Sequence, residues 1–258
     1  RKVSEMGDTT TLSKASLEGD TTTVGNQDSV QMGESMEMLD IPRLSLLDVV
    51  MKRAEELNLL EKIQRVVIAG KFKKPTDNGE AMRGVMDGVV RQVVNQDEDG
   101  GEITGILLGM AGCFLAILEG PQRLVIGALR QLQESGGQAQ ELLASSHCLS
   151  SIQDAPGRSF PCYASRILQL PKAEGVVPDK DAIVTLIPDI SMNLQRFGME
   201  LSKVGEDERE RLLDAMQRKH GQHLPRVEDV LGLCGSPHVM TLEEFFDLYY
   251  SPNQCLGG

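Results

Sequence analysis

Two short apolar runs, residues 103–108 and 113–118, stand close together near the middle of the chain. The residues between them, Gly109 to Gly112, form a glycine-bearing connection whose length suits a β-hairpin with a bulge or a short loop. Each run has the length of a strand and is almost continuously apolar rather than alternating. Because strands of this kind need cover on both sides, the pattern predicts a hairpin buried on both faces.

The hairpin is predicted to lead directly into a helix. Glu119-Gly120-Pro121 interrupts the second apolar run, and proline is tolerated in the first turn of a helix. Apolar residues then recur at helical spacing, at Leu124, Val125, Ala128, Leu129 and Leu132. At this corner we expect the carboxylate of Glu119 to cap the helix N-terminus, where free N–H groups and the helix dipole favour a negative charge.

Further elements are predicted upstream of the hairpin. A capping-box-like start predicts a helix over residues 45–62, and the apolar run at residues 65–69 predicts a short buried strand. An apolar stripe predicts a second helix over about residues 80–94. In that helix Gly84 and Gly88 lie four residues apart, which weakens the helix but permits a close approach to a sheet.

Downstream of the hairpin and its helix, residues 145–153 and 163–170 are predicted as two more strands. The order is then strand, helix, strand, strand, helix, strand, strand. This order predicts an α+β fold with a ferredoxin-like βαββαβ sheet, in which two helices lie on one face and the hairpin runs across the middle.

The C-terminal third of the chain is predicted to be mainly helical. Prolines punctuate the connector that precedes the helices, and within it residues 183–187, just before Pro188, are predicted as a short strand or helix. Thr241 offers a helix cap. Helical or amphipathic patterns cover residues 192–203, 206–219, 227–233 and 242–250. These helices either cover the open face of the sheet or form a separate docking surface.

The chain is therefore divided into a tail (1–40), an N-terminal helix (41–63), an α+β domain (64–170) and a helical C-terminal extension (171–258). The tail is rich in Ser, Thr, Gly and acidic residues and contains the sequence GDTTT twice. It has no apolar period, so it cannot bury enough apolar surface to offset the entropy of ordering. We interpret it as a disordered tail, with a segment that lies extended across a partner as the alternative.

Charge and cysteine content restrict the classes of function. A net charge of −12 argues against nucleic-acid and anionic-membrane partners, and the basic cluster Lys71 to Lys74 is interpreted as a solvated strand end. We find no apolar segment long enough to cross a bilayer and no secretory leader at the start of the sequence. The five cysteines include no CxxC pair, and we interpret them as reduced thiols in a reducing compartment.

The search for catalytic or metal-binding chemistry identifies one histidine pair. His220 and His223 are three residues apart, but Gly221 and Pro225 break a helix there and Cys234 is the only soft ligand nearby. We therefore predict a surface pair and no metal site. The chain has neither a phosphate-binding glycine motif nor a nucleophile elbow, and a hydrolase of ferredoxin-like fold would need an Arg–Asn pair that we do not identify. We predict that the protein is not an enzyme and has no small-molecule substrate.

Several short motifs of the central region recur together in one family. They are I-T-G and L-L within residues 103–108, G-x-F and L-E-G within residues 112–120, His147, and R-x-F-x-x-Y at residues 158–163. In this respect residues 64–170 resemble the BLUF family of blue-light sensors that bind flavin. The resemblance implies the same βαββαβ sheet.

The resemblance does not extend to the residues that contact flavin. Alignment places Ile68 at the family's strand-one Tyr, Ala116 at its strand-three Gln and Glu98 at its flavin-anchoring Asn. Tyr163 replaces a Trp and is the one conservative exchange. Because hydrocarbon side chains neither donate nor accept hydrogen bonds, we expect no cofactor. A flavin-binding blue-light or redox regulatory domain is the alternative.

BLUF-like sheets without these flavin residues also occur in proteins of motile cilia and sperm flagella, among them testis-expressed ones, and the chain is similar to that group. The resemblance implies a non-catalytic scaffold subunit of the axoneme, such as a central-pair projection, within the cytoplasm and cytoskeleton. Its partners would be other axonemal proteins that dock on the degenerate BLUF-like domain.

Overall fold

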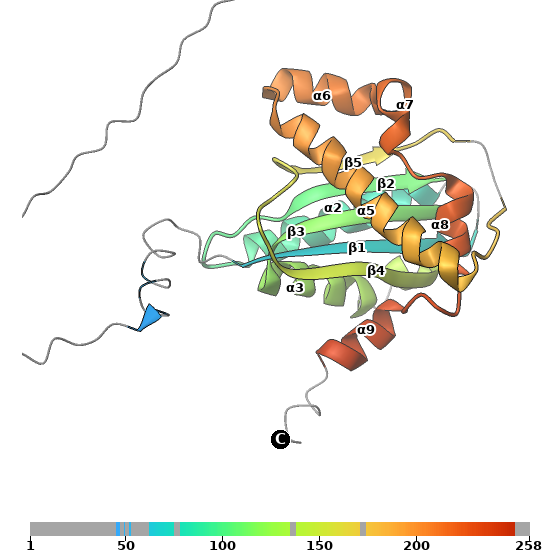
Figure 1. Ribbon diagram of the computed structural model, residues 1–258, viewed down its shortest axis with the longest axis horizontal. Helices are drawn as coiled ribbons and strands as arrows, with labels where there is room; N and C mark the ends of the chain where they lie inside the picture. The colour runs from blue at the N-terminus through green and yellow to red at the C-terminus, as the bar shows by residue number, and fades with distance from the viewer. Residues whose placement is uncertain are drawn as a thin grey trace, which may run out of the picture. The chain divides into compact units, whose positions relative to one another are not determined.

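A five-stranded mixed β-sheet is the centre of the structure, a computed structural model (Figure 1). The structure describes residues 62–74, 78–134, 138–170 and 174–250, together with Ser45, Leu46, Val49 and Lys52. The predicted tail and the predicted helix at residues 45–62 lie almost entirely outside the described residues. The division of the chain into four parts stays a prediction.

The sheet has the strand order β4-β1-β3-β2-β5. β2 and β5 pair in parallel and the other neighbours pair antiparallel. The strands are β1 (Ile63–Phe72), β2 (Thr104–Met110), β3 (Cys113–Pro121), β4 (Leu143–Ala155) and β5 (Tyr163–Ile167). With α2 after β1 and α3 after β3, the first four strands have the ferredoxin-like arrangement, so the predicted α+β fold is confirmed.

The predicted hairpin is formed by β2 and β3, and every residue of both strands is buried. Only Ala111 and Gly112 connect them, and Gly112 has a positive φ of 87°. Pro121 does not enter the helix as expected, because it pairs with Ile63 of β1 as the last residue of β3. The helix that follows, α3 (Gln122–Glu134), begins one residue later.

Two helical layers cover the two faces of the sheet. On one face α2 (Asn78–Asn95) and α3 pack against Val66, Ile68 and Leu107, and the short helix α4 (Gln138–Leu142), which the sequence pattern does not predict, lies beside them. On the other face, α5 (Lys180–Ser202) and α8 (Val227–Cys234) pack against the alternate residues, among them Val67 and Ile106. Figure 1 shows α5 in front of the strands and α2 and α3 behind them. Of the two predicted alternatives, cover for the open face of the sheet or a separate docking surface, the C-terminal helices therefore follow the first.

The sequence pattern predicts a connector with a short strand or helix at residues 183–187, followed by a separate helix at residues 192–203. The structure instead has one continuous helix, α5, over both segments. It is one helix of 23 residues that includes Pro188. Asp179 caps it by accepting a hydrogen bond of 2.7 Å from the N–H of Ala182. Pro188 removes only one helical hydrogen bond, and buried residues on both sides of it, Ile183 and Ile190, hold the helix on the sheet. Among the described helices, including this one, none is long and apolar enough to span a membrane.

The remaining helices follow the predicted positions with one interruption. The pattern at residues 206–219 is divided at Ala215 into α6 (Glu206–Asp214) and α7 (Met216–Lys219), and the 3₁₀ helix η1 (Gly221–His223) follows. α9 (Leu242–Tyr249) begins with a capping box in which Thr241 and Glu244 bond each other's backbone N–H groups. The predicted cap at Thr241 is confirmed.

The expectation that Gly84 and Gly88 allow a close approach to the sheet is wrong. Both are exposed, and a Cβ atom at either position would meet nothing within 4 Å. A glycine is required instead at Gly105 of β2, where φ is 138° and a Cβ would lie 1.9 Å from the carbonyl oxygen of Ile117. In α2, therefore, the two glycines only lower helix stability.

Replacement of Gly84 or Gly88 by alanine should stabilise the protein. Each substitution removes backbone freedom from the unfolded chain and meets no steric conflict, so the free energy of unfolding should rise by about 0.5–1 kcal/mol. Urea denaturation followed by circular dichroism measures this change. Gly105→Ala is the contrasting variant and should lower stability, whereas no gain from either α2 variant would contradict this account of the helix.

Candidate functional site

The positions where the BLUF resemblance would place flavin-binding groups lie inside the apolar core. Ile68 of β1 and Ala116 of β3 are direct partners in the sheet register, and both are fully buried. They belong to the same core cluster as Met86 of α2 and as Val125 and Leu129 of α3. The sheet face between these two helices therefore presents hydrocarbon, with no polar group at either position to orient a ring.

The other two aligned residues lie elsewhere. Glu98 is exposed in the turn after α2. Tyr163 begins β5, and its hydroxyl donates a hydrogen bond of 3.0 Å to Asp87 of α2, which also accepts one of 3.1 Å from Ser165. Burial, and next the charge of Asp87, raise the pKa of Tyr163, so it acts as a neutral donor. Asp87, Tyr163 and Ser165 line a cleft of about 640 Å³. The four positions do not form one site.

A buried ion pair joins β1 to β3. Glu119 does not cap α3 as expected, because its Oε1 accepts a hydrogen bond of 2.6 Å from Nε of Arg65, the residue opposite it in the register. The two side chains are 0% and 7% exposed. The signal in the sequence was Arg65 itself, a charge inside an apolar strand, since a buried charge requires a partner.

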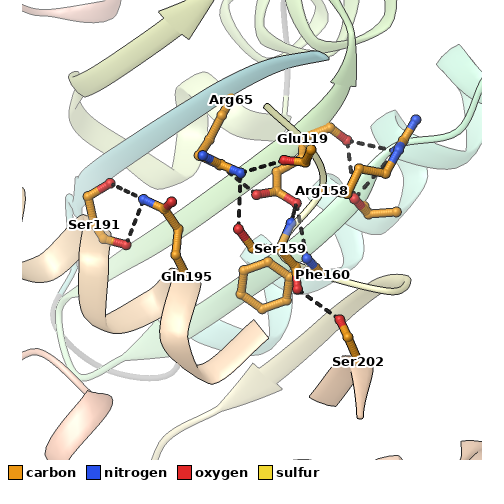
Figure 2. A network of polar contacts seen from close by, with 10 residues as sticks. Arg65, Glu119, Arg158, Ser159, Phe160, Ser191, Gln195 and Ser202 are labelled. Atoms are coloured by element: carbon orange, nitrogen blue, oxygen red, sulfur yellow. Dashed lines mark hydrogen bonds and ion pairs between the residues drawn. The ribbon is translucent and has the colours of Figure 1, made fainter. Parts of the chain in front are cut away.

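The same carboxylate holds the loop between β4 and β5. Its Oε2 accepts hydrogen bonds from the backbone N–H groups of Ser159, at 2.7 Å, and Phe160, at 3.0 Å (Figure 2). Arg158 donates to the carbonyl oxygens of Glu102 and Glu119, at 2.8 and 3.3 Å. The L-E-G and R-x-F motifs, which are distant in the sequence, are therefore two halves of one structural network.

The second helical layer is attached to this network. Ser202 at the end of α5 donates a hydrogen bond of 3.0 Å to the carbonyl oxygen of Ser159. Gly198 of the same helix approaches so closely that a Cβ would lie 2.8 Å from the ring of Phe160. We interpret the Arg65–Glu119 network as structural, because its polar atoms are directed at one another and at backbone groups.

The outer edge of β4 offers an open surface. The N–H of Cys148 donates a hydrogen bond of 3.0 Å to the carbonyl oxygen of Met240, and His147 forms an isolated bridge with Thr241. Beyond this pairing, residues 151–154 of β4 are exposed, with Ile152 39% exposed. A cleft of about 600 Å³ runs along this edge and is lined by Cys148, Leu149, Ser150, Ser151, Gln153, Ile187, His238, Val239, Met240, Phe245 and Tyr249.

The chemistry of this cleft suits binding better than reaction. Burial raises the pKa of Cys148 to about 12, so its thiol stays protonated at neutral pH and is a poor nucleophile. His147 is buried and its Nδ1 lies 3.3 Å from the carbonyl oxygen of Val239. We name this surface, defined by its lining residues and Ile152, the β4-edge cleft.

Comparison with protein families identifies the chain. Residues 62–251 match the model of the family described as testis-expressed protein 47. The chain belongs to the testis-expressed protein 47 family. The match covers all five strands and every helix from α2 to α9, so the second helical layer is part of the family region. A comparison with curated proteins gave no match.

Solved structures of BLUF proteins are similar at low identity. The structure entitled BlrP1 BLUF is 23% identical, covers 64% of this chain and 97% of its own, and has a TM-score of 0.31. BlrB, a BLUF protein in its dark state, is 18% identical over 52% of this chain and 84% of its own, with a TM-score of 0.30. A bacterial light-regulated adenylyl cyclase is 20% identical with a TM-score of 0.33. The match covers 58% of this chain and only 39% of the cyclase.

Replacement of Glu119 by glutamine should strongly destabilise the protein. The variant leaves the Arg65 guanidinium buried without its charge partner, which costs about 3–5 kcal/mol of the free energy of unfolding. In an Arg65→Met background, the same Glu119→Gln change should cost less, because the unpaired charge is gone. Urea denaturation of the four proteins in this double-mutant cycle gives the coupling energy.

Lys62→Met is the matched control for this cycle. Lys62 pairs with Asp154 at 3.1 Å, but the two side chains are 75% and 58% exposed. Loss of this exposed ion pair should therefore lower the free energy of unfolding by less than about 1 kcal/mol. Equal losses for Glu119→Gln and Lys62→Met, or a coupling energy near zero, would contradict the central role of the buried pair.

Proposed function

We propose that this protein is a non-catalytic structural subunit of the axoneme of a motile cilium or flagellum, with its degenerate BLUF-like domain as a protein-docking platform. The observation that carries the proposal is the hydrocarbon core at Ile68 and Ala116, where flavin-binding relatives have polar groups. Membership of a testis-expressed family and the resemblance to flavin-free ciliary proteins support the axonemal location. A central-pair projection is the assembly that we favour.

The β4-edge cleft is the part of the platform that we assign to a partner. Both faces of the sheet are covered by this chain's own helices, so the docking element must be an edge or the outer side of a helix. An outer strand presents backbone groups that can pair with another strand. The segment at Met240 and Thr241 already pairs with β4 in this way, and the exposed residues that follow can continue it.

The occupant that we propose is an extended segment of another axonemal protein. It would add to β4 through backbone hydrogen bonds and place apolar side chains against Ile152 and Tyr249, which are 39% and 59% exposed. A net charge of −12 favours a partner segment with basic residues beside its apolar positions. It also argues against nucleic acid and anionic membranes as partners, and we propose no small-molecule substrate.

The purified protein should not bind flavin. After incubation with riboflavin, flavin mononucleotide or the dinucleotide and removal of free ligand by gel filtration, its visible spectrum should show no flavin absorption. A flavin-binding BLUF domain treated in the same way is the positive control. A yellow protein would favour the alternative, a blue-light or redox regulatory domain.

The β4-edge cleft should be required for attachment to the axoneme. A tagged full-length protein in ciliated cells should stay with axonemes after detergent removes the membrane and matrix. Ile152→Lys should release it, because the charge cannot be buried against a partner strand. Retention is measured by quantitative blotting of the soluble and axonemal fractions.

Val184→Lys is the matched control, since Val184 is also a β-branched side chain, 68% exposed, but lies on α5. Both variants should show the wild-type circular dichroism spectrum. Extraction of the wild-type protein with detergent would overturn the axonemal assignment. Equal retention of the two variants would leave that assignment standing and overturn the choice of the β4 edge.

A further inference from the structure

Three potential metal ligands meet beside the C-terminal end of α5. They are Glu200 of α5, His220 at the end of α7 and His223 of η1. Each offers one ligand atom, and these atoms all lie within 4.8 Å of one another. The carboxylate lies between the imidazoles, with Oε2 at 2.9 Å from Nδ1 of His220 and Oε1 at 3.4 Å from Nε2 of His223.

The local backbone explains why the two histidines lie together. Gly221 does end the α-helix, as the sequence indicates, but the chain continues as a 3₁₀ turn in which the N–H of His223 bonds the carbonyl oxygen of His220 at 2.9 Å. Side chains at i and i+3 are eclipsed in a 3₁₀ helix. The two imidazole rings are accordingly stacked, with centroids 6.2 Å apart and planes at 20°.

The cluster is partly buried rather than on the surface as predicted. The side chains of His223, His220 and Glu200 are 11%, 17% and 37% exposed. The ring of Phe197 lies against His220, with centroids 5.4 Å apart. Two buried atoms of the cluster, Oε2 of Glu200 and Nδ1 of His223, make no hydrogen bond among the described residues. The site therefore combines a fixed apolar wall with polar atoms whose hydrogen bonding is incomplete, which is unusual unless another species takes part.

We propose that Glu200, His220 and His223 form a binding site for a divalent transition-metal ion, with Zn²⁺ as the best match. Two imidazoles and one carboxylate are a donor set that zinc accepts, and a fourth tetrahedral position would remain for water. Zinc bonds of about 2.0–2.2 Å place tetrahedral ligands roughly 3.4 Å apart. The three ligand atoms, which all lie within 4.8 Å of one another, would adjust to that spacing around the ion.

The two imidazoles and the carboxylate also determine which metal ions can bind and which parts of the chain a bound ion would connect. Mg²⁺ and Ca²⁺ prefer all-oxygen ligands, so the two imidazoles should exclude them. A bound ion would connect α5 to the segment that follows α7, and its charge would offset the negative carboxylate of Glu200. It would thereby fix the end of the helix that also bonds the β4–β5 loop through Ser202. The proposal does not depend on the axonemal role.

Isothermal titration of the full-length, chelator-treated protein with Zn²⁺ under reducing conditions tests the site. One ion per chain should bind, and Mg²⁺ should give no signal. His220→Ala, His223→Ala and Glu200→Gln should each weaken binding by more than the roughly tenfold to hundredfold typical of an outer-shell change. Co²⁺ in place of Zn²⁺ should give the visible absorption of a tetrahedral site in the wild-type protein only.

His238→Ala is the control, because His238 is exposed and belongs to the β4-edge cleft. It should bind Zn²⁺ as tightly as the wild-type protein. Circular dichroism of each variant without metal separates lost ligands from lost folding, and Glu200→Gln keeps the shape of the side chain if a histidine variant unfolds. Equal affinities for the wild-type, His223→Ala and Glu200→Gln proteins would overturn the proposal and leave a proton-mediated His–Glu cluster.

Discussion

The buried pair between Arg65 and Glu119 is the interaction on which the arrangement of the layers depends. Its two members are opposite each other on the central strands β1 and β3, so it fixes the middle of the sheet. The other oxygen of the carboxylate accepts the N–H groups of Ser159 and Phe160, in the middle of the loop to β5. Because that loop also contacts α5 through Ser159 and Phe160, one buried carboxylate couples the sheet to the second helical layer. A buried charge is costly unless it is paired and hydrogen-bonded, and here both oxygens of the Glu119 carboxylate accept hydrogen bonds.

The alternation of side chains along the strands explains how one apolar run supports two cores. Val66 and Ile68 face α2 and α3, whereas Val67 and Ala69 face α5 and α8. The two cores meet only through the sheet, which is why the strands show no polar alternation. At the position where a flavin-binding sheet needs polar groups, Ile68 and Ala116 extend the first core without interruption.

Sequence reasoning predicted the elements whose signals are local. The hairpin, α2, α3, α8 and the cap at Thr241 were recognisable because periodicity and capping are written within a few neighbouring residues. Of α5, only the part after residue 191 was predicted as a helix, because Pro188 is a local breaker whose effect is outweighed by burial on both sides. The role of Glu119 was also missed, since its partner is 54 positions away. The histidine pair was found, but Glu200 comes from another helix and joins it only in three dimensions.

The two edges of the sheet differ in a way that bears on docking. At the β5 edge, Arg166 pairs with Glu210 of α6, and the amide of Gln217 in α7 exchanges hydrogen bonds of 2.7 and 3.2 Å with the backbone of Gln169. At the β4 edge, the pairing found among the described residues stops at Met240 and Thr241, and residues 151–154 of the strand are exposed. An open strand edge is a liability for aggregation unless it is shielded or used. Helices of this chain cover both faces of the sheet, and side chains of α6 and α7 bond residues at the β5 edge, which is why we assign the proposed docking to the β4 edge.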